Sequence, residues 1–313
     1  MQLTHDILDR LDKLEEKYAV MGQDILSYLD GLLYADYLTY WDYIHLDTLL
    51  SLQSPRTPLP DEYIFITYHQ ITELYFKMVI QAIDQLIYAE ELTKELFIRQ
   101  LERINRYFEQ LIQSFDIMVD GMDKDEFLKF RMSLLPASGF QSAQFRKIEI
   151  LSTDLYQLTH ASRRENLTKE SPVEALYPNL YWKSGATELA TGKKTLTLRQ
   201  FEEKYSQEFI ELATQVKSHN LWQTYQKLSA EDQQDETLIK HLRDYDFNVN
   251  VRWSLSHFRS AARHLENKPK VIEATGGTNW QDYLPPRLQL IVYYPALWSE
   301  EELKTWGRRS KLA

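Results

Sequence analysis

The sequence predicts an all-α protein, and two observations carry this prediction. Only 9 glycines and 10 prolines occur among 313 residues, so long segments lack the residues that break helices. In those segments Leu, Ile and Tyr recur at the spacing of an amphipathic helix, with Glu, Lys and Gln between them. Hydrophobic residues make up 43% of the chain, so a chain of this length buries a sizeable core.

The periodicity also gives the expected order of the helices. They cover residues 3–32, 37–54, 61–89, 93–118, 123–135, 142–158, 197–218, 221–228 and 230–266. Pro55, Pro58 and Pro60 predict an extended link between the second and third of these helices. The third and fourth helices are long and share a short connection, which predicts an antiparallel pair.

The chain shows no internal repeat, no low-complexity tract and no clean boundary. We therefore expect residues 1–313 to form a single domain in which residues 1–36 supply an N-terminal helix. Residues 160–195 read as irregular and polar, but aromatic residues recur in them. That combination predicts an insertion or a lid rather than a linker.

Charge and cysteine content exclude several classes of protein. The net charge is −10 and the pI about 5.4, which argues against a nucleic-acid surface and against binding to anionic membranes. No apolar stretch approaches the roughly 20 residues that span a bilayer, and the N-terminus lacks a secretion signal, so we expect a cytoplasmic protein. Cysteine is absent, which excludes disulfides, thiolate-bound zinc, iron–sulfur clusters and a thiolate haem ligand.

The first candidate site residue is a histidine in the stretch D-E-Y-I-F-I-T-Y-H-Q-I-T-E-L-Y-F-K, residues 61–77. On a helix, His69 lies on the same face as Phe65 and Phe76. An imidazole on an aromatic face is expected to be sheltered from water and to need a partner. Glu73, one turn later, is a candidate to orient it. The alternative is a core histidine that a neighbour satisfies.

The second candidate is an arginine in D-E-F-L-K-F-R-M-S-L-L-P-A-S-G-F-Q-S, residues 125–142. Arg131 follows Phe127 by four residues, so a helix presents the guanidinium beside an aromatic ring. Its planar fork suits a carboxylate, and an apolar wall strengthens that pairing. Ser138 and Gly139 then predict a tight turn whose N–H groups and hydroxyl receive an anionic group. The alternative is a helix corner with a surface arginine.

The third candidate is a histidine on the last long helix. His257 lies beside the apolar stripe, and Ser254, Ser260 and Ala261 on its own face are all small. Small neighbours leave room for a flat macrocycle against the helix, which a proximal haem histidine requires. His264 is a weaker candidate of the same type. The alternative is an ordinary core or surface histidine.

The fourth candidate is the glycine-containing stretch A-T-G-G-T-N-W, residues 274–280. Gly276 and Gly277 permit positive φ and a close approach of the backbone to a ligand. Thr275 and Thr278 offer hydroxyls to a polar head group. The lysine and spacing of a nucleotide-binding loop are missing, so phosphate is not expected. The alternative is an ordinary glycine turn.

These four pieces, in this order, resemble the tryptophan 2,3-dioxygenase family from about Tyr37 to Trp298. The most specific motif is P-A-S-G-F-Q-S followed by Q-F-R. The motif F-I-x-x-H-Q-x-x-E-L-x-F-K at Phe65–Lys77 is nearly as specific. W-x-x-x-H at Trp253–His257 and T-G-G at Thr275–Gly277 are less specific but correctly placed.

The resemblance implies an all-helical homotetramer, built as a dimer of dimers, with one b-type haem per subunit. It implies that dioxygen opens the indole ring of L-tryptophan to give N-formylkynurenine. Carried over by position, His257 becomes the proximal iron ligand, and His69 lies on the distal side near the indole N–H. The cofactor contacts implied by the resemblance are Ser138, near a haem propionate, together with Trp253 and Gly276.

The same resemblance implies the substrate contacts. Phe65 and Phe127 wall the indole, and Arg131 pairs with the substrate carboxylate. Thr275 contacts the ammonium and carboxylate end of the substrate.

A last set of substrate contacts is implied to come from a neighbouring subunit. Tyr40, Tyr43 and Ile44 match an aromatic segment that the family inserts into the neighbour's pocket.

Two departures from the family pattern lie near the substrate: Trp280 replaces a small residue beyond the glycines, and Trp41 stands where a glycine is usual. They motivate one alternative, a haem mono-oxygenase on the same scaffold acting on another indole or aromatic amino acid. A non-catalytic helical haem-binding or assembly protein is the alternative from another class.

Overall fold

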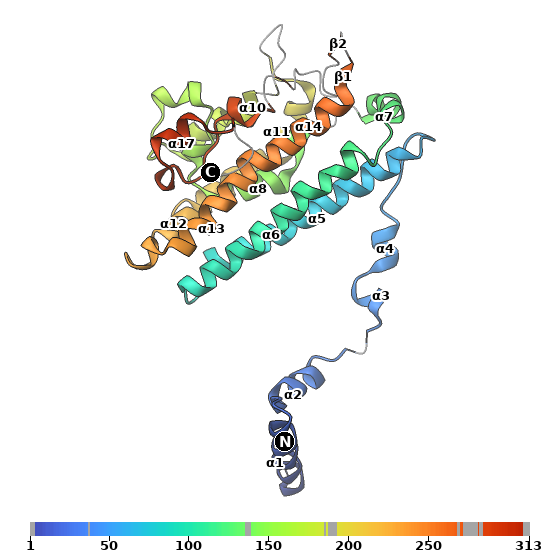
Figure 1. The fold of residues 1–313 in the computed structure, drawn as a ribbon, viewed down its shortest axis with the longest axis vertical. Helices are drawn as coiled ribbons and strands as arrows, with labels where there is room; N and C mark the ends of the chain where they lie inside the picture. The colour runs from blue at the N-terminus through green and yellow to red at the C-terminus, as the bar shows by residue number, and fades with distance from the viewer. Residues whose placement is uncertain are drawn as a thin grey trace. The chain divides into compact units, whose positions relative to one another are not determined.

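The computed structural model describes residues 4–36, 38–134, 139–184, 186, 193–267, 270–271, 281 and 284–308, and within them the protein is all-α as predicted (Figure 1). Contacts divide the chain into two units, Met1–Ser54 and Pro55–Ala313. The prediction of a single domain stays a prediction. None of the described helices is both long and apolar enough to cross a membrane.

The first unit consists of short helices without a core of their own. They are α1 (His5–Val20), α2 (Ile25–Leu33), α3 (Tyr40–Tyr43) and α4 (Leu46–Leu50). The prediction of one helix over residues 3–32 was wrong, because the chain turns at Gly22, where φ is +65°. Asp24 then starts α2 by accepting a hydrogen bond from the N–H of Leu26 at 3.0 Å. No residue of these four helices is buried.

Long helices form the core of the second unit. They are α5 (Asp61–Ile87), α6 (Lys94–Val119), α8 (Ala143–Ser152), α11 (Leu196–Val216), α13 (Glu236–Phe247) and α14 (Ser254–Leu265). α5 and α6 lie side by side and are joined by a short connection, as predicted for an antiparallel pair (Figure 1). Ile83 of α5 and Leu101 and Phe108 of α6 are fully buried between the helices.

Shorter elements connect the long helices. The α-helical ones are α7 (Lys124–Phe130), α9 (Val173–Leu176), α10 (Tyr181–Ser184), α12 (Leu221–Tyr225), α16 (Pro286–Gln289) and α17 (Glu300–Lys304). The 3-10 turns are η1 (Arg131–Leu134), η2 (Gly139–Gln141), η3 (Leu155–Leu158), η4 (Ala161–Asn166), η5 (Tyr177–Asn179), η6 (Asp232–Gln234) and η8 (Pro295–Leu297). The two-residue strands β1 (Glu266–Asn267) and β2 (Lys270–Val271) pair antiparallel after α14.

Other expected helices also differ. The one over residues 37–54 is broken into α3 and α4 at His45, where φ is +51°. The one over residues 123–135 becomes a 3-10 turn after Phe130, and the one over residues 142–158 ends at Ser152. The long helix expected over residues 230–266 contains a π-helical turn, η7 (Asn248–Trp253), between α13 and α14. The described part of 160–195 consists of short helical turns, and its role as a lid stays a prediction.

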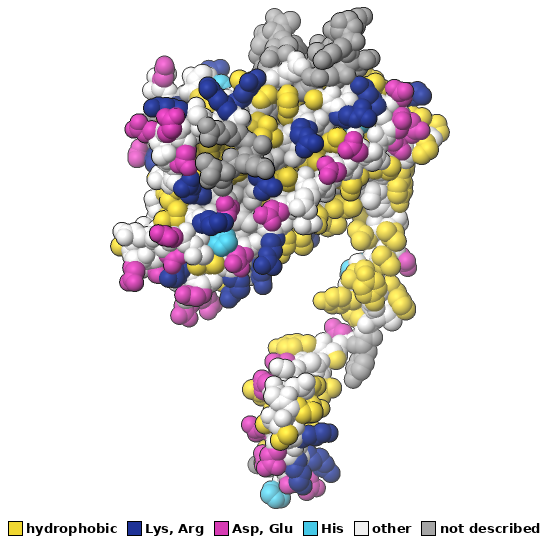
Figure 2. Space-filling view, in the orientation of Figure 1, with side chains coloured by type: hydrophobic (Ala, Val, Ile, Leu, Met, Phe, Trp, Pro, Cys, Tyr) yellow, Lys and Arg dark blue, Asp and Glu magenta, His cyan; other side chains and the backbone are white. Residues whose placement is uncertain are grey.

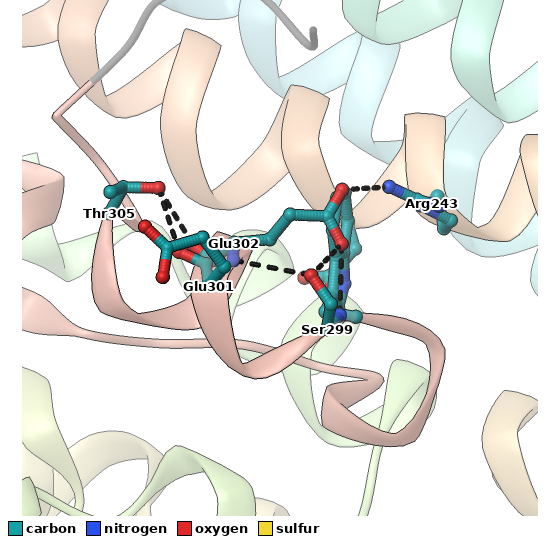
Figure 3. A network of polar contacts seen from close by, with 7 residues as sticks. Arg243, Ser299, Glu301, Glu302 and Thr305 are labelled. Atoms are coloured by element: carbon teal, nitrogen blue, oxygen red, sulfur yellow. Dashed lines mark hydrogen bonds and ion pairs between the residues drawn. The ribbon is translucent and has the colours of Figure 1, made fainter.

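The helix α17, near the C-terminus, begins with a capping box and is joined to α13 by an ion pair (Figure 3). The Ser299 side chain caps α17, and the Glu302 carboxylate accepts from the Ser299 N–H at 2.9 Å, so the two residues form a capping box. The same carboxylate pairs with the guanidinium of Arg243 on α13.

The buried carboxylate of Asp246 also joins the C-terminal segment to α13, through several hydrogen bonds. Asp246 of α13 accepts from the N–H groups of Tyr293 and Tyr294, at 2.9 and 3.1 Å. It also accepts from Trp298 Nε1 at 2.9 Å and from Asn250 Nδ2 at 2.8 Å. Burial raises the pKa of Asp246 to about 6, so the group is still ionised at neutral pH and both oxygens accept.

Replacing Asp246 with alanine is expected to destabilise the fold substantially. Four buried donors lose their acceptor, and we expect the free energy of unfolding to fall by about 3 kcal/mol or more. Urea denaturation at pH 7.5 measures it. The control is Asp244→Ala on the same helix, which removes only the exposed pair with Lys240 and should cost less than about 1 kcal/mol. Equal losses in the two variants would contradict the anchoring role of Asp246.

Candidate active site

The side chain of His69 is held by its own helix. Its Nδ1 lies 2.7 Å from the carbonyl oxygen of Phe65. A carbonyl only accepts, so we assign the proton to Nδ1, which leaves Nε2 as an acceptor. Desolvation by the surrounding protein lowers the pKa of His69 below its ordinary value, and the charge of Glu73 opposes that effect only in part. The ring is therefore a neutral imidazole at pH 7.

Two expectations about His69 were wrong. The side chain is exposed rather than buried, although nearby protein atoms still desolvate its ring. Glu73 does not bind it, because the Glu73 carboxylate accepts from Gln144 Nε2 at 2.9 Å. The carbonyl of Phe65 accepts the hydrogen bond from His69 Nδ1 instead.

An aromatic wall stands beside His69. The ring of Phe65 lies 4.1 Å from the imidazole and 6.2 Å from the ring of Phe127 on α7. Phe130 packs edge-on against both phenylalanines, at 5.8 and 5.5 Å. The structure thus brings together Phe65, His69 and Phe127, which are residues predicted for the site from two separate segments.

Hydrogen bonds at the start of α5 set the position of α7. The carboxylate of Asp61 accepts from the N–H of Asp123 at 2.5 Å. In return the N–H of Asp61 donates to the carboxylate of Glu126 at 3.2 Å. The two helix starts are therefore tied in both directions, which fixes the backbone of α7 from which Phe127 projects.

Arg131 follows Phe127 by four residues and begins the 3-10 turn η1. Only 5% of its surface is exposed, and burial lowers the pKa of its guanidinium. The group stays a cation at pH 7, because an arginine begins from a pKa above about 12. Because the guanidinium is buried, little water competes with a carboxylate that binds to it.

His257 lies on α14, directly after the π-helical turn. Its ring stacks on Phe115 of α6 at 6.1 Å with an interplanar angle of 23°. Among the residues that the structure describes, no hydrogen bond reaches either ring nitrogen. Burial, together with the electrostatic effect of the nearby His69, lowers the pKa of His257 to about 4. His257 is thus a neutral imidazole with an uncommitted lone pair, and it lies close enough to His69 for their charges to interact.

The π-helical turn that precedes α14 is pinned to α6. Asn248 donates from Nδ2 to Asn105 Oδ1 at 3.0 Å, and Asn105 donates to the carbonyl of His241 at 3.0 Å. A π turn adds a residue to the helix and rotates everything that follows it. Trp253 ends this turn and packs against Phe115 at 4.6 Å.

Sequence reasoning missed the asparagine pair and the π turn. The signal for them was present in N-V-N-V, because two asparagines inside an apolar helical stretch require buried partners.

The remaining predicted site residues are placed only in part. Ser138, Thr275, Gly276 and Trp280 lie outside the described residues. Tyr40, Tyr43 and Ile44 belong to the first unit, where Tyr40 is 70% exposed and Tyr43 is 74% exposed. Trp41, between them, is also exposed.

Comparison with known proteins decides the family. A profile described as Tryptophan 2,3-dioxygenase matches residues 33–275. The chain belongs to the tryptophan 2,3-dioxygenase family. The resemblance predicted from the four motifs is therefore confirmed.

The relatives match most of this chain. A protein of Bradyrhizobium sp. BTAi1 named tryptophan 2,3-dioxygenase is 30% identical over 274 residues, which cover 83% of this chain and 91% of the relative. One of the same name from Ruegeria sp. TM1040 is 28% identical over 279 residues, covering 85% and 92%. Tryptophan 2,3-dioxygenase 2 of Ralstonia nicotianae is 41% identical over 128 residues, covering 36% and 34%.

Membership of the tryptophan 2,3-dioxygenase family implies a haem cofactor, and the surroundings of His257 fit one. A proximal ligand has to be a neutral imidazole whose nitrogen is not engaged elsewhere. His257 meets both conditions. Ser254 and Ala261, which share the face of His257, are small and only half-buried, as a helix that lies against a macrocycle requires. His264, the other candidate, donates from Nε2 to the carbonyl of Met118, and its ring is almost wholly buried, so no macrocycle can reach its other nitrogen.

Proposed function

We propose that this chain is a haem-dependent dioxygenase that inserts both atoms of dioxygen into the indole ring of L-tryptophan and releases N-formylkynurenine. Family membership carries the proposal. Two neutral imidazoles support it: His69 lies beside the aromatic wall, and His257 is close enough to His69 for their charges to interact, which suits an iron on one side and an indole on the other.

The cofactor would be haem b, one per subunit, with His257 as iron ligand and Ser138, Trp253 and Gly276 beside it. When bound, haem supplies the ferrous iron that activates dioxygen for reaction with an organic substrate. The protein contributes position and exclusion of water. Both oxygen atoms remain in the product, one on each carbon of the broken indole bond, so no further reductant is consumed.

The substrate would be held at both of its ends. The Nε2 of His69 accepts from the indole N–H, which a neutral imidazole protonated at Nδ1 can do. Phe65 and Phe127 hold the indole plane. Arg131 receives the carboxylate, and Thr275 contacts the ammonium end. His69 is thus a group that orients the substrate rather than an obligatory base.

Counting the oxygen atoms in the product tests the reaction. The haem-loaded protein is supplied with L-tryptophan and isotopically labelled dioxygen, and the product is weighed by mass spectrometry. We expect two labelled atoms per molecule. One labelled atom would replace the proposal by mono-oxygenation on the same scaffold, which the departures at Trp41 and Trp280 make the second candidate.

We further propose a homotetramer, a dimer of dimers, in which the first unit completes a neighbour's site. Large apolar side chains of this unit are exposed at the end of α2 and over α3 and α4, where they gather in a patch (Figure 2). They include Leu32, Leu33, Tyr34, Leu38, Tyr40, Trp41, Tyr43, Leu50 and Leu52. A patch of this kind marks an interaction surface. A cytoplasmic location stays a prediction.

Complementation between two inactive chains tests this exchange. Tyr43→Ala should lower activity by about tenfold or more through loss of an aromatic contact with the substrate. Arg131→Ala should inactivate its own site. In mixed assemblies the Tyr43→Ala chain keeps Arg131 and receives an intact Tyr43 from its neighbour, so activity should return. Mixed assemblies that stay as inactive as the two variants alone would contradict the exchange. Tyr88→Ala, exposed on the second unit, serves as the control.

A further inference from the structure

His264 is a buried histidine that the proposed mechanism does not use. It lies on α14, seven residues after His257, and is only 2% exposed. Its Nε2 is within hydrogen-bond distance of the carbonyl of Met118, and a carbonyl only accepts, so Nε2 carries the proton. Nδ1 is then a bare acceptor, and it has no partner among the residues that the structure describes.

The hydrogen bond has a reason in the geometry of α6. Met118 lies in the last turn of that helix, whose carbonyls have no partner within the helix. The next N–H groups, those of Asp120 and Gly121, donate to the carbonyls of Asp116 and Ile117 and not to that of Met118. His264 therefore supplies a donor that the helix end lacks, and this bond ties α14 to the end of α6.

The imidazole also touches the proposed substrate wall. Its ring lies 4.8 Å from the ring of Phe127, and Phe127 lies 6.2 Å from Phe65. Phe127 therefore has two ring neighbours from different helices: His264 of α14 and Phe65 of α5. Leaving Nδ1 without a partner costs free energy, and an apolar side chain of similar size would avoid that cost.

We propose that His264 is a positioning residue that sets the distance between Phe127 and Phe65, and through it the fit of the indole. The inference rests on the proposed function, because it needs Phe127 to wall the substrate. His264 acts through Phe127 and need not touch the substrate itself. The hydrogen bond to Met118 holds the imidazole of His264 in place. The imidazole in turn limits where the ring of Phe127 can lie.

Three variants of His264 test the inference. Leucine and asparagine both lose the bond to Met118, the first because it has no donor and the second because it is too short. Glutamine keeps a donor at about the reach of Nε2. The dissociation constant of L-tryptophan is measured by anaerobic calorimetry on the haem-loaded protein, and KM and kcat are measured separately.

We expect the leucine and asparagine variants to weaken L-tryptophan binding by about tenfold, with kcat changed by less than about twofold and haem occupancy unchanged. Glutamine should restore the dissociation constant to within about twofold of wild type. In a Phe127→Leu background the leucine variant should add little, because the two changes act on one contact. His241→Gln, a half-buried histidine of α13, is the control.

Each other outcome has a definite meaning. Unchanged binding in the asparagine variant, or weakened binding that glutamine does not restore, would overturn the role of His264 alone. The asparagine and glutamine pair decides the matter if the leucine variant does not fold. A wild-type protein that binds haem but no L-tryptophan would overturn the proposed substrate, and this inference with it.

Discussion

Replacing His257 with alanine is expected to leave a folded protein that no longer retains haem. His257 has a pKa of about 4 and an uncommitted lone pair. His264 cannot take its place, because its ring is almost wholly buried and packs against Phe127, which leaves no room for a macrocycle. Loss of a mere hydrogen-bond partner of a metal ligand costs about 10- to 100-fold in affinity, so loss of the ligand itself should exceed that range.

The measurement is haem content per chain after titration with haemin, together with the absorption spectrum. His219→Ala is the control, because His219 packs edge-on against Tyr88 in another part of the second unit. Added imidazole should restore haem binding to the His257→Ala protein, since it fits the space that the side chain leaves. A fully loaded variant with an unchanged spectrum would remove His257 from the proximal role.

Replacing Arg131 with alanine is expected to weaken L-tryptophan binding while haem stays bound. A buried guanidinium forms a charge-assisted fork with a carboxylate, and loss of one partner of such a pair costs about 3 kcal/mol, or roughly a hundredfold in KM. Steady-state kinetics on the haem-loaded variant measure this change.

Two controls isolate the carboxylate. Tryptamine, which lacks the carboxylate, should bind wild type and the Arg131→Ala protein with similar affinity. Lys129→Ala removes an exposed cation from the same helix and should leave KM unchanged. An Arg131→Ala protein whose KM for L-tryptophan equals that of wild type would contradict the pairing.

Helical periodicity was enough to predict the parts of the site that lie on one helix. Phe65 and His69 are four residues apart, so any α-helix at that position brings their rings together. The same reasoning placed Phe127 one turn before Arg131. It could not give the approach of Phe127 to Phe65, which depends on the bonds that Asp61 makes to the start of α7.

The errors at Glu73 and at the π turn share one physical cause, which is that partners distant in sequence leave no mark on a local pattern. Glu73 is one turn from His69, but it binds Gln144, a residue 71 positions further along the chain. Gly22 was one glycine inside an apolar repeat, and the sequence did not show that its φ is positive. The π turn before α14 likewise depends on Asn105 of another helix.

The most direct test of the account follows the reaction itself. The haem-loaded protein is reduced without oxygen and mixed with L-tryptophan, air is admitted, and absorbance is followed at the band of N-formylkynurenine. The account predicts that this band grows once oxygen enters and that it does not grow with the His257→Ala protein. A reduced, haem-loaded wild-type protein that forms no N-formylkynurenine under these conditions would contradict it.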